Sequence, residues 1–318
     1  MSASPRPAPV HTRPAAPARA RANLETTPPV AYGPANALVA AYLAASTVPL
    51  ALAVAHGRTD PTRLVVHLAM LALVVAVPRS ARRIPLLGTL AALLPLLLVP
   101  PMYTELPHVA AGLGGALHDA AVLGWERELF GGAFFGESPA RTLSGHAPWR
   151  PLSEALHAGY LSYYALIYGP PLRLALAGRR RALGETVFTV MLAFVCCYAA
   201  FVVFPVQGPW FQWPAPTTIP TGPMRALVER ILHAGSARGS AFPSSHVAVS
   251  LAQTLVTIRH QRRLGWLVAA CTATLALGAV YGGLHYGVDV LVGALLGAAI
   301  GVVGPRLHAR LEARFHTA

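Results

Sequence analysis

The feature that most constrains this chain is a series of apolar runs of about 17–25 residues, the length that an α-helix needs to cross a bilayer. The runs cover residues 37–56, 62–78, 84–101, 152–176, 185–205, 244–260, 264–283 and 286–304. Only 12% of the residues are charged, about half of the fraction in a soluble domain. The sequence therefore predicts an all-α, polytopic transmembrane helix bundle of about eight spans, and it excludes an ordinary cytosolic enzyme.

The charge of the chain is lopsided, because all 25 basic residues are arginine and only 12 acidic residues oppose them. Such a basic balance can indicate a nucleic-acid partner, but these arginines interrupt apolar runs and form no continuous stripe. On the eight-span topology, 17 of the 25 arginines fall on one set of flanks, and most acids fall on the other. Since cytoplasmic flanks carry the positive excess, we expect a multi-pass protein of the cell membrane with both termini in the cytoplasm.

The segments around the spans divide the chain into four parts. Residues 1–36 are rich in Pro, Ala and Arg and contain no apolar run, which indicates a disordered cytoplasmic tail. We expect an accessory transmembrane hairpin over 37–83, the main membrane domain over 84–305 and a cytoplasmic tail over 306–318.

The long outer loop 102–151 contains apolar residues at near-helical spacing, with Asp119, Glu126 and Glu128 between them. The apolar set is Leu113, Leu117, Ala120, Ala121, Gly124 and Leu129. This pattern predicts an amphipathic helix at the outer membrane interface, with one apolar face and one charged face. The helix would be a lid or brace, or it would contact the substrate directly.

Two short polar stretches stand out, and the predicted topology puts both at the outer surface. The first is AFPSSH at residues 241–246, where the sixth span begins. Serine is a preferred N-cap, and the first turn of a helix exposes unpaired N–H groups that bind anions, phosphate above all. Ser244 and Ser245 therefore form a candidate phosphate cradle, and His246 adds an imidazole that can donate a proton.

The second stretch, YGGLHYGVD at residues 281–289, lies at the start of the last span. His285 and Asp289 are four residues apart and so share one helical face. A carboxylate bonded to one ring nitrogen leaves the other nitrogen free to attack an electrophile; the alternative is a structural clamp. For the two histidines to act together, their rings must lie within about ten ångströms of each other.

The two stretches resemble the last two signature motifs of the type-2 phosphatidic acid phosphatase superfamily, and the resemblance covers roughly residues 100–305. Earlier features resemble one branch, the inositol phosphorylceramide synthase-like (inositolphosphotransferase-like) membrane proteins. These features are Asp119, Trp125-Glu126, Phe130-Gly131, Leu156-His157-x-x-Tyr160-x-x-Tyr163-Tyr164 and Phe204-Pro205-x-x-Gly208-Pro209. The resemblance implies a six-helix phosphatase-type core within the bundle.

The resemblance also implies a role for each residue of the two stretches. His285 would attack phosphorus and form a phosphohistidine, with Asp289 orienting its ring. His246 would protonate the leaving oxygen and then act as base on the acceptor. Ser244, Ser245 and their amides would hold the non-bridging oxygens. The scheme requires no metal or cofactor, and the sequence has no obvious metal-ligand cluster.

Three departures from the phosphatase form concern the phosphate-binding groups. That form has a Lys-x6-Arg-Pro motif, whereas this chain has no lysine. Its Ser-Arg before the last histidine is Gly278-Ala279 here, and Ser245 replaces a glycine. A phosphoryl group needs cationic partners, typically arginine. The nearest replacement is Arg238, followed by Arg225 and Arg230 in the same outer loop.

Aromatic residues on the predicted span 152–176 follow a near-helical spacing and form one face. They are His157, Tyr160, Tyr164 and Tyr168. Such a stripe either packs within the bundle or lines the groove for a headgroup or acceptor, where tyrosine hydroxyls suit a wet, polar end.

These residues favour an integral membrane phosphotransferase or phosphatase that acts on a lipid phosphate at the extracytoplasmic face. Loss of the last-motif arginine resembles the inositolphosphotransferase-like branch, which favours transfer. One alternative is a simple phosphatase of lipid phosphates or polyprenyl diphosphates. An alternative of another class is a non-catalytic transporter or scaffold, although a transporter would place broken helices near the bilayer midplane. No residue indicates the oligomeric state.

Overall fold

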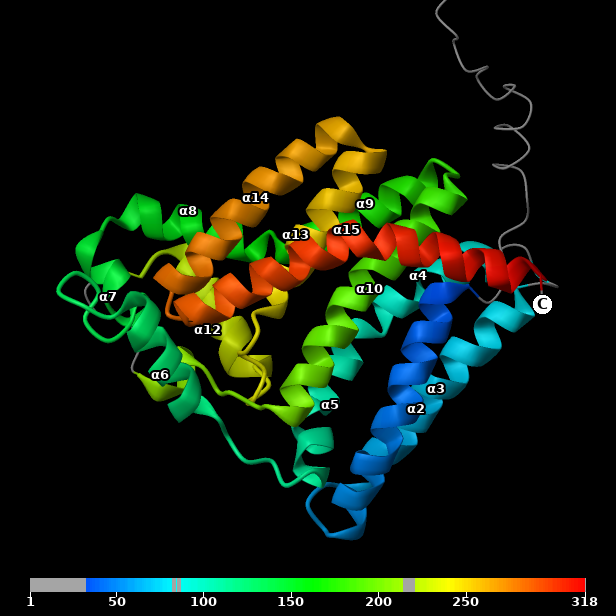
Figure 1. Cartoon of the computed structure of the whole chain (residues 1–318), viewed down its shortest axis with the longest axis horizontal. Helices are drawn as coiled ribbons and strands as arrows, with labels where there is room; N and C mark the ends of the chain where they lie inside the picture. The colour runs from blue at the N-terminus through cyan, green and yellow to red at the C-terminus, as the bar shows by residue number, and fades with distance from the viewer. Residues whose placement is uncertain (1–32, 82–83, 85–86, 214–220, 318) are drawn as a thin grey trace, which may run out of the picture.

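The structure is a computed structural model that describes residues 33–81, 84, 87–213 and 221–317. In these residues the regular structure is α-helical apart from two isolated β-bridges, which confirms the predicted all-α bundle. Most of the predicted N-terminal tail, residues 1–32, lies outside the described residues, as do Arg82 and Arg83. Figure 1 shows the helices with the labels used below.

Among the described residues, six segments are long and apolar enough to cross a membrane. Single helices form five of them: α2 (Pro34–Ala55), α3 (Pro61–Ser80), α10 (Arg180–Val203), α14 (Arg262–Tyr281) and α15 (Gly287–Thr317). The sixth combines α4 (Leu87–Leu97) with α5 (Val99–Gly112). All six agree with predicted spans except at their ends, because α5 continues past residue 101 and α15 continues through most of the expected C-terminal tail. Pro100 and Pro101 do not stop α5, since they occupy its first turn, where a missing N–H is tolerated.

The remaining two predicted spans are short or broken. The helix α13 (Ser245–His260) has 16 residues. The predicted span 152–176 is two helices, α8 (Arg150–Leu161) and α9 (Tyr163–Leu176), which meet at Ser162. The Ser162 hydroxyl donates to the carbonyl of Gly159 (2.6 Å), and bonding of this kind bends helices.

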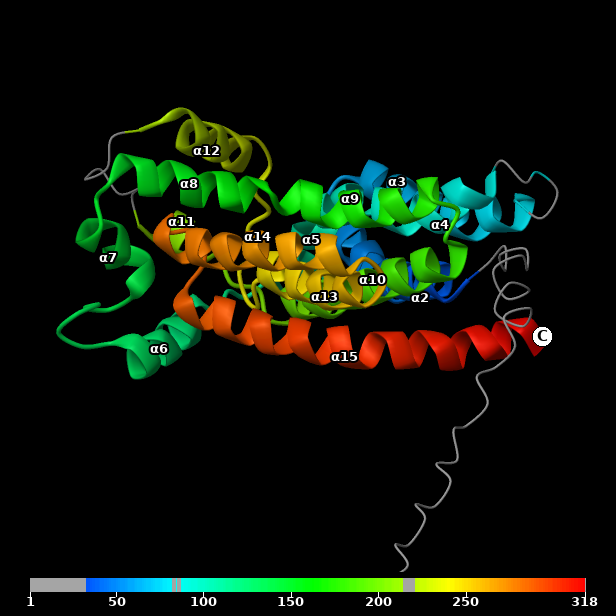
Figure 2. The same ribbon diagram turned by 90° about the horizontal axis from the view of Figure 1, so that it is seen from above.

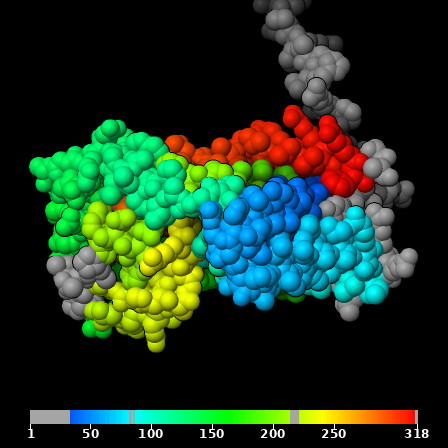
Figure 3. Space-filling model, turned by 90° about the horizontal axis from the view of Figure 1, so that it is seen from below, coloured from blue at the N-terminus to red at the C-terminus, as the bar shows by residue number. Residues whose placement is uncertain are grey.

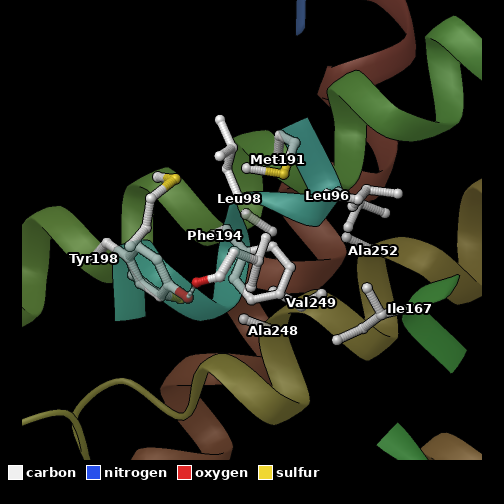
Figure 4. Packing of buried hydrophobic residues seen from close by; sticks show 14 of the residues in the cluster. Leu96, Leu98, Ile167, Met191, Phe194, Tyr198, Ala248, Val249 and Ala252 are labelled. Carbon is white, nitrogen blue, oxygen red and sulfur yellow. Dashed lines mark hydrogen bonds between the residues drawn. The ribbon is translucent and has the colours of Figure 1, made fainter. Parts of the chain in front are cut away.

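The core surrounds α13, which packs against α9, α10, α14 and α15. In Figure 2, α15 runs along one face of the molecule, α8 and α9 lie along the opposite face, and α10 and α13 lie between them. Figure 4 shows Phe194 of α10 near Ala248 and Val249 of α13. The contact between α13 and α15 is close because α15 has glycine where it crosses: a Cβ at Gly293 would lie 2.6 Å from the Ser244 carbonyl oxygen.

The N-terminal hairpin packs against the rest of the bundle through both of its helices: α2 contacts α5 and α10, and α3 contacts α4. In Figure 3 its blue and cyan surface lies beside the rest of the molecule. A buried polar contact also joins it to α5. The His67 ring lies between the Glu105 carboxyl group (2.7 Å) and the Leu43 carbonyl (2.8 Å).

At one end of the bundle, several turns that carry the predicted cytoplasmic arginines meet. Arg179 donates to the carbonyl of His260 (2.8 Å), and Arg259 pairs with Glu185 (2.9 Å). Arg181 lies 3.8 Å from Glu312 near the end of α15. The contacts put these three flanks together at one end.

At the other end of the bundle lie short helices (Figure 1). They are α6 (Asp119–Phe130), α7 (Pro139–His146), α11 (Pro209–Gln212) and α12 (Pro223–Gly235). The predicted interfacial helix corresponds to α6, although it begins only at Asp119, and its predicted apolar residues lie mostly on the surface of the molecule. Leu113, Leu117 and Leu129 are more than half exposed, whereas the buried side chains of α6 are Asp119, Val122 and Glu126. The two buried carboxylates accept hydrogen bonds from backbone amides, which is why they face inward.

Candidate functional site

The first candidate stretch forms the start of α13, as predicted. Ser244 is the N-cap, and its hydroxyl accepts from the amide of Val247 (3.4 Å). Its own amide donates to the carbonyl of Asp289 (3.0 Å). Within the described part of the chain, the amides of Ser245 and His246 have no hydrogen-bond acceptor. The unpaired donors of this helix start are therefore those of Ser245 and His246.

The second stretch forms a tight turn between α14 and α15. The amides of Leu284 and His285 both donate to the carbonyl of Ala279 (2.9 and 3.0 Å), and Gly283 has a φ of 66°, a conformation that glycine adopts without strain. Asp289 lies in the first turn of α15 and accepts from the amide of Tyr286 (2.9 Å). This backbone contact fixes the turn on the α15 side.

The His285 ring is held at one nitrogen. Its Nδ1 atom lies 3.0 Å from the carbonyl oxygen of Ala241 and 3.5 Å from Oδ2 of Asp289. A carbonyl oxygen can only accept, so Nδ1 carries the proton and Nε2 keeps its lone pair. Nε2 is the nitrogen of His285 that can attack an electrophile. The Ala241 carbonyl is the closer of the two partners of the His285 ring. Asp289 lies near the ring and also accepts from the Tyr286 amide at the start of α15.

The two histidine rings lie together, with centroids 5.6 Å apart, well within the distance that the sequence requires. Two tyrosines of the broken segment α8–α9 contact the His246 ring. The Tyr160 hydroxyl is 3.1 Å from His246 Nε2, and the Tyr163 ring centroid is 4.3 Å from that of His246. The predicted nucleophile and the predicted proton donor thus lie in one site, and two tyrosine rings contact His246.

Comparison with known families agrees with this geometry. The family model for the PAP2 superfamily matches residues 121–303, which is more than half of the chain. The chain belongs to the PAP2 superfamily. No curated protein and no solved structure matches the chain. Members of the PAP2 superfamily are phosphatases and phosphotransferases, so membership supports an enzyme that acts on phosphate esters.

The predicted phosphate-binding residues of this PAP2 protein differ in their surroundings. Ser244 is fully buried against α15 and already caps α13, whereas Ser245 carries one of the two unpaired amides and His246 carries the other. Arg238 is exposed, and its guanidinium lies over the ring of Phe211 (5.2 Å). Arg225 is buried on α12 and pairs with Glu229 (2.8 Å). The phosphate-binding roles of Ser244, Ser245 and Arg238 stay predictions.

The aromatic stripe predicted on one helix face was only partly right. Tyr160 reaches His246, but Tyr164 is half exposed, and the second tyrosine at His246 is Tyr163. The break at Ser162 rotates the second half of the segment relative to the first, so a single helical period does not describe both. The sequence reasoning also missed the Ala241 carbonyl, because backbone atoms leave no sequence signal.

Proposed function

We propose that this PAP2-superfamily protein is an integral membrane enzyme that transfers the phosphoryl-containing group of a lipid phosphate through a phosphohistidine intermediate. The observation that carries the proposal is the pair of histidine rings with centroids 5.6 Å apart, in which Nδ1 of His285 is held by the Ala241 carbonyl. This arrangement leaves one ring as nucleophile and the other as proton donor.

In the first step, Nε2 of His285 attacks phosphorus and the bond from phosphorus to the leaving oxygen breaks. The leaving oxygen takes the electron pair of that bond and a proton from His246. The Tyr160 hydroxyl is hydrogen-bonded to Nε2 of His246, whereas Nδ1 of His246 has no hydrogen-bond partner among the described residues. Nδ1 is therefore the His246 nitrogen left to meet the leaving oxygen.

In the second step, the oxygen of an acceptor attacks phosphorus, the bond from phosphorus to His285 breaks, and His246 takes the proton of the acceptor. With water as acceptor the reaction is hydrolysis, and with an alcohol it is transfer. The absence of the last-motif arginine favours the inositolphosphotransferase type. The simple lipid phosphate or polyprenyl diphosphate phosphatase is the alternative.

Binding of the phosphate would use the start of α13, where the amides of Ser245 and His246 are unpaired and the helix dipole favours an anion. The Ser245 hydroxyl and Arg238 would complete the contacts. Arg238→Ala should then raise KM while leaving the fold intact. Unchanged kinetics in that variant would move the cationic role to Arg225 or Arg230.

The proposed site faces the extracytoplasmic side and receives its substrate from the bilayer. The arginine asymmetry of the flanks supports this sidedness, because the turns at Arg179, Arg181 and Arg259 meet at the end opposite the short helices. A lipid is the expected substrate because both histidines lie at the ends of apolar helices.

The test is to trap the intermediate with a lipid phosphate that carries a labelled phosphoryl group, using the full chain in membranes. The expected product is a protein adduct that is labile to acid and stable to base, and that maps to His285. His285→Ala should abolish the adduct, whereas His56→Ala, which changes an exposed histidine, should leave it unchanged. An adduct that survives in His285→Ala, or no adduct with active enzyme, would refute the mechanism. A transporter or scaffold would form none and turn over nothing.

A further inference from the structure

The first turn of α15, which follows His285 directly, has no capping side chain in its own sequence. Tyr286 precedes the helix, at the position where Ser, Thr, Asp or Asn usually accepts from the first amides. Asp289 satisfies the amide of Tyr286 in the manner of the reciprocal half of a capping box. The amides of Gly287 and Val288 therefore need an acceptor from elsewhere in the chain.

Glu126 of α6 supplies that acceptor across 161 residues of sequence. Its Oε1 atom accepts from the amide of Gly287 (2.9 Å), and Oε2 accepts from the amide of Val288 (2.8 Å). The Ser138 hydroxyl also donates to Oε1 (2.7 Å). Glu126 is fully buried, so these three charge-assisted hydrogen bonds are shielded from water and strong.

The other end of α6 is attached to the segment that follows α10. Asp119 accepts from the amides of Gln207 (3.0 Å) and Gly208 (3.1 Å). The adjacent Val206 pairs with the segment that contains Ala241, since its carbonyl accepts from the Ala241 amide (2.9 Å). The carbonyl of Ala241 in turn accepts from Nδ1 of His285. Glu126 thus holds the helix start next to His285. Asp119 holds the segment that pairs with Ala241, whose carbonyl fixes the His285 ring.

We propose that Glu126 is a positioning residue for His285, and that α6 is a brace that holds the reactive nitrogen in place. Glu126 touches neither of the reacting histidine rings in this arrangement; it acts through the first turn of α15. A displacement of about 1 Å at a reacting atom can cost about 100-fold in rate. The effect on turnover rests on the proposed phosphohistidine function, whereas the effect on the geometry of His285 does not.

The substitution Glu126→Gln tests the proposal with little change in side-chain volume. An amide group has one acceptor oxygen, so its NH2 would face the N–H of Gly287 or Val288. At least one of the two hydrogen bonds to these amides would therefore be lost. The matched control is Glu128→Gln, the same change two residues later on the exposed side of α6. Turnover of a lipid phosphate is measured per folded molecule, with the folded fraction taken from thermal unfolding in detergent.

We expect kcat of Glu126→Gln to fall about 10–100-fold with KM changed less than about threefold, because the phosphate contacts at α13 are untouched. Glu128→Gln should keep the wild-type values. A loss of folded protein alone would lower the amount of enzyme but not kcat per folded molecule. A wild-type kcat in folded Glu126→Gln would overturn the proposal.

A second readout does not depend on activity. The rate at which diethyl pyrocarbonate modifies His285, followed by mass spectrometry of the full chain, reports how firmly that buried ring is held. His285 is 4% exposed, so a loosened first turn should make modification of His285 faster in Glu126→Gln, with the rate at exposed His56 unchanged. If the wild-type protein shows neither turnover nor a phosphohistidine, the proposed function fails and this rate alone decides the role of Glu126. An unchanged His285 rate in that case would overturn the proposal.

Discussion

The rings of His246 and His285 lie with centroids 5.6 Å apart, although one is in the first turn of α13 and the other precedes α15. The contact between α13 and α15 produces this proximity, because the amide of Ser244 donates to the carbonyl of Asp289 (3.0 Å). The two helix starts are therefore tied to each other by the backbone, two residues from His246 and four residues from His285. The proposed chemistry depends on this tie.

The proposed roles of the two histidines predict that their substitutions affect turnover differently, depending on the leaving group. His246→Ala should slow turnover of a lipid phosphate about 10²–10⁴-fold, the usual contribution of general acid–base catalysis. It should slow release of 4-nitrophenolate from 4-nitrophenyl phosphate much less in a single turnover, because that leaving group needs no proton. His285→Ala should abolish both reactions. Equal losses on the two substrates in His246→Ala would contradict its role as acid.

The hydroxyl of Tyr160 gives a second prediction. Tyr160→Phe removes the hydrogen bond to His246 Nε2 and keeps the ring that stacks on the imidazole (centroids 4.9 Å apart). Since one hydrogen bond contributes about 0.5–1.5 kcal/mol, kcat should fall about 2–10-fold with the unfolding temperature nearly unchanged. Steady-state kinetics check this, with Tyr164→Phe as the control because Tyr164 is half exposed. A larger effect in the control would show that the tyrosine hydroxyls act on the substrate and not through His246.

The parts of this site that depend on local sequence could be predicted from it. Ser244 caps α13 as its residue type and position indicate, and the spacing of His285 and Asp289 puts both on one side of a helix start. The membrane-length segments follow from apolar runs whose length a bilayer dictates. These features need only the residues within one or two turns.

The features that the sequence did not reveal depend on distant contacts. The inward face of α6 was not predicted, and it contains Asp119 and Glu126 because backbone amides of other segments lie opposite them. One signal was available in the sequence. Tyr286 has no side-chain acceptor suited to cap α15, so a side chain from elsewhere had to accept from the first amides of the helix. Even that signal does not identify Glu126 among the acidic residues of the outer segment.

The close contact between α13 and α15 makes a prediction about stability. A Cβ at Gly297 would collide with the carbonyl oxygen of Ala248, a backbone atom that cannot move alone. Gly297→Ala should therefore force the two helices apart and lower the free energy of unfolding by about 1–3 kcal/mol. Gly124→Ala is the control, since a Cβ there has no heavy atom within 4 Å and should be neutral or stabilising by about 0.5–1 kcal/mol. Thermal unfolding in detergent would decide, and an unaffected Gly297→Ala would mean that the helices are less tightly packed than the structure has them.

The buried pair of His67 and Glu105 predicts how the N-terminal hairpin is held. The His67 ring is 1% exposed and lies 2.7 Å from the Glu105 carboxyl group, so His67→Ala leaves a buried acidic group without its partner. Removal of one partner from a buried pair typically costs about 3–5 kcal/mol, and we expect a loss of that order, together with faster proteolysis in the turn between α2 and α3. His56→Ala, in that turn and exposed, should change neither quantity. Because the contacts of the pair join the hairpin to α5 and include neither His246 nor His285, kcat per folded molecule should stay within about twofold of the wild-type value. A large fall in kcat without a fall in stability would instead give the hairpin a direct part in the reaction.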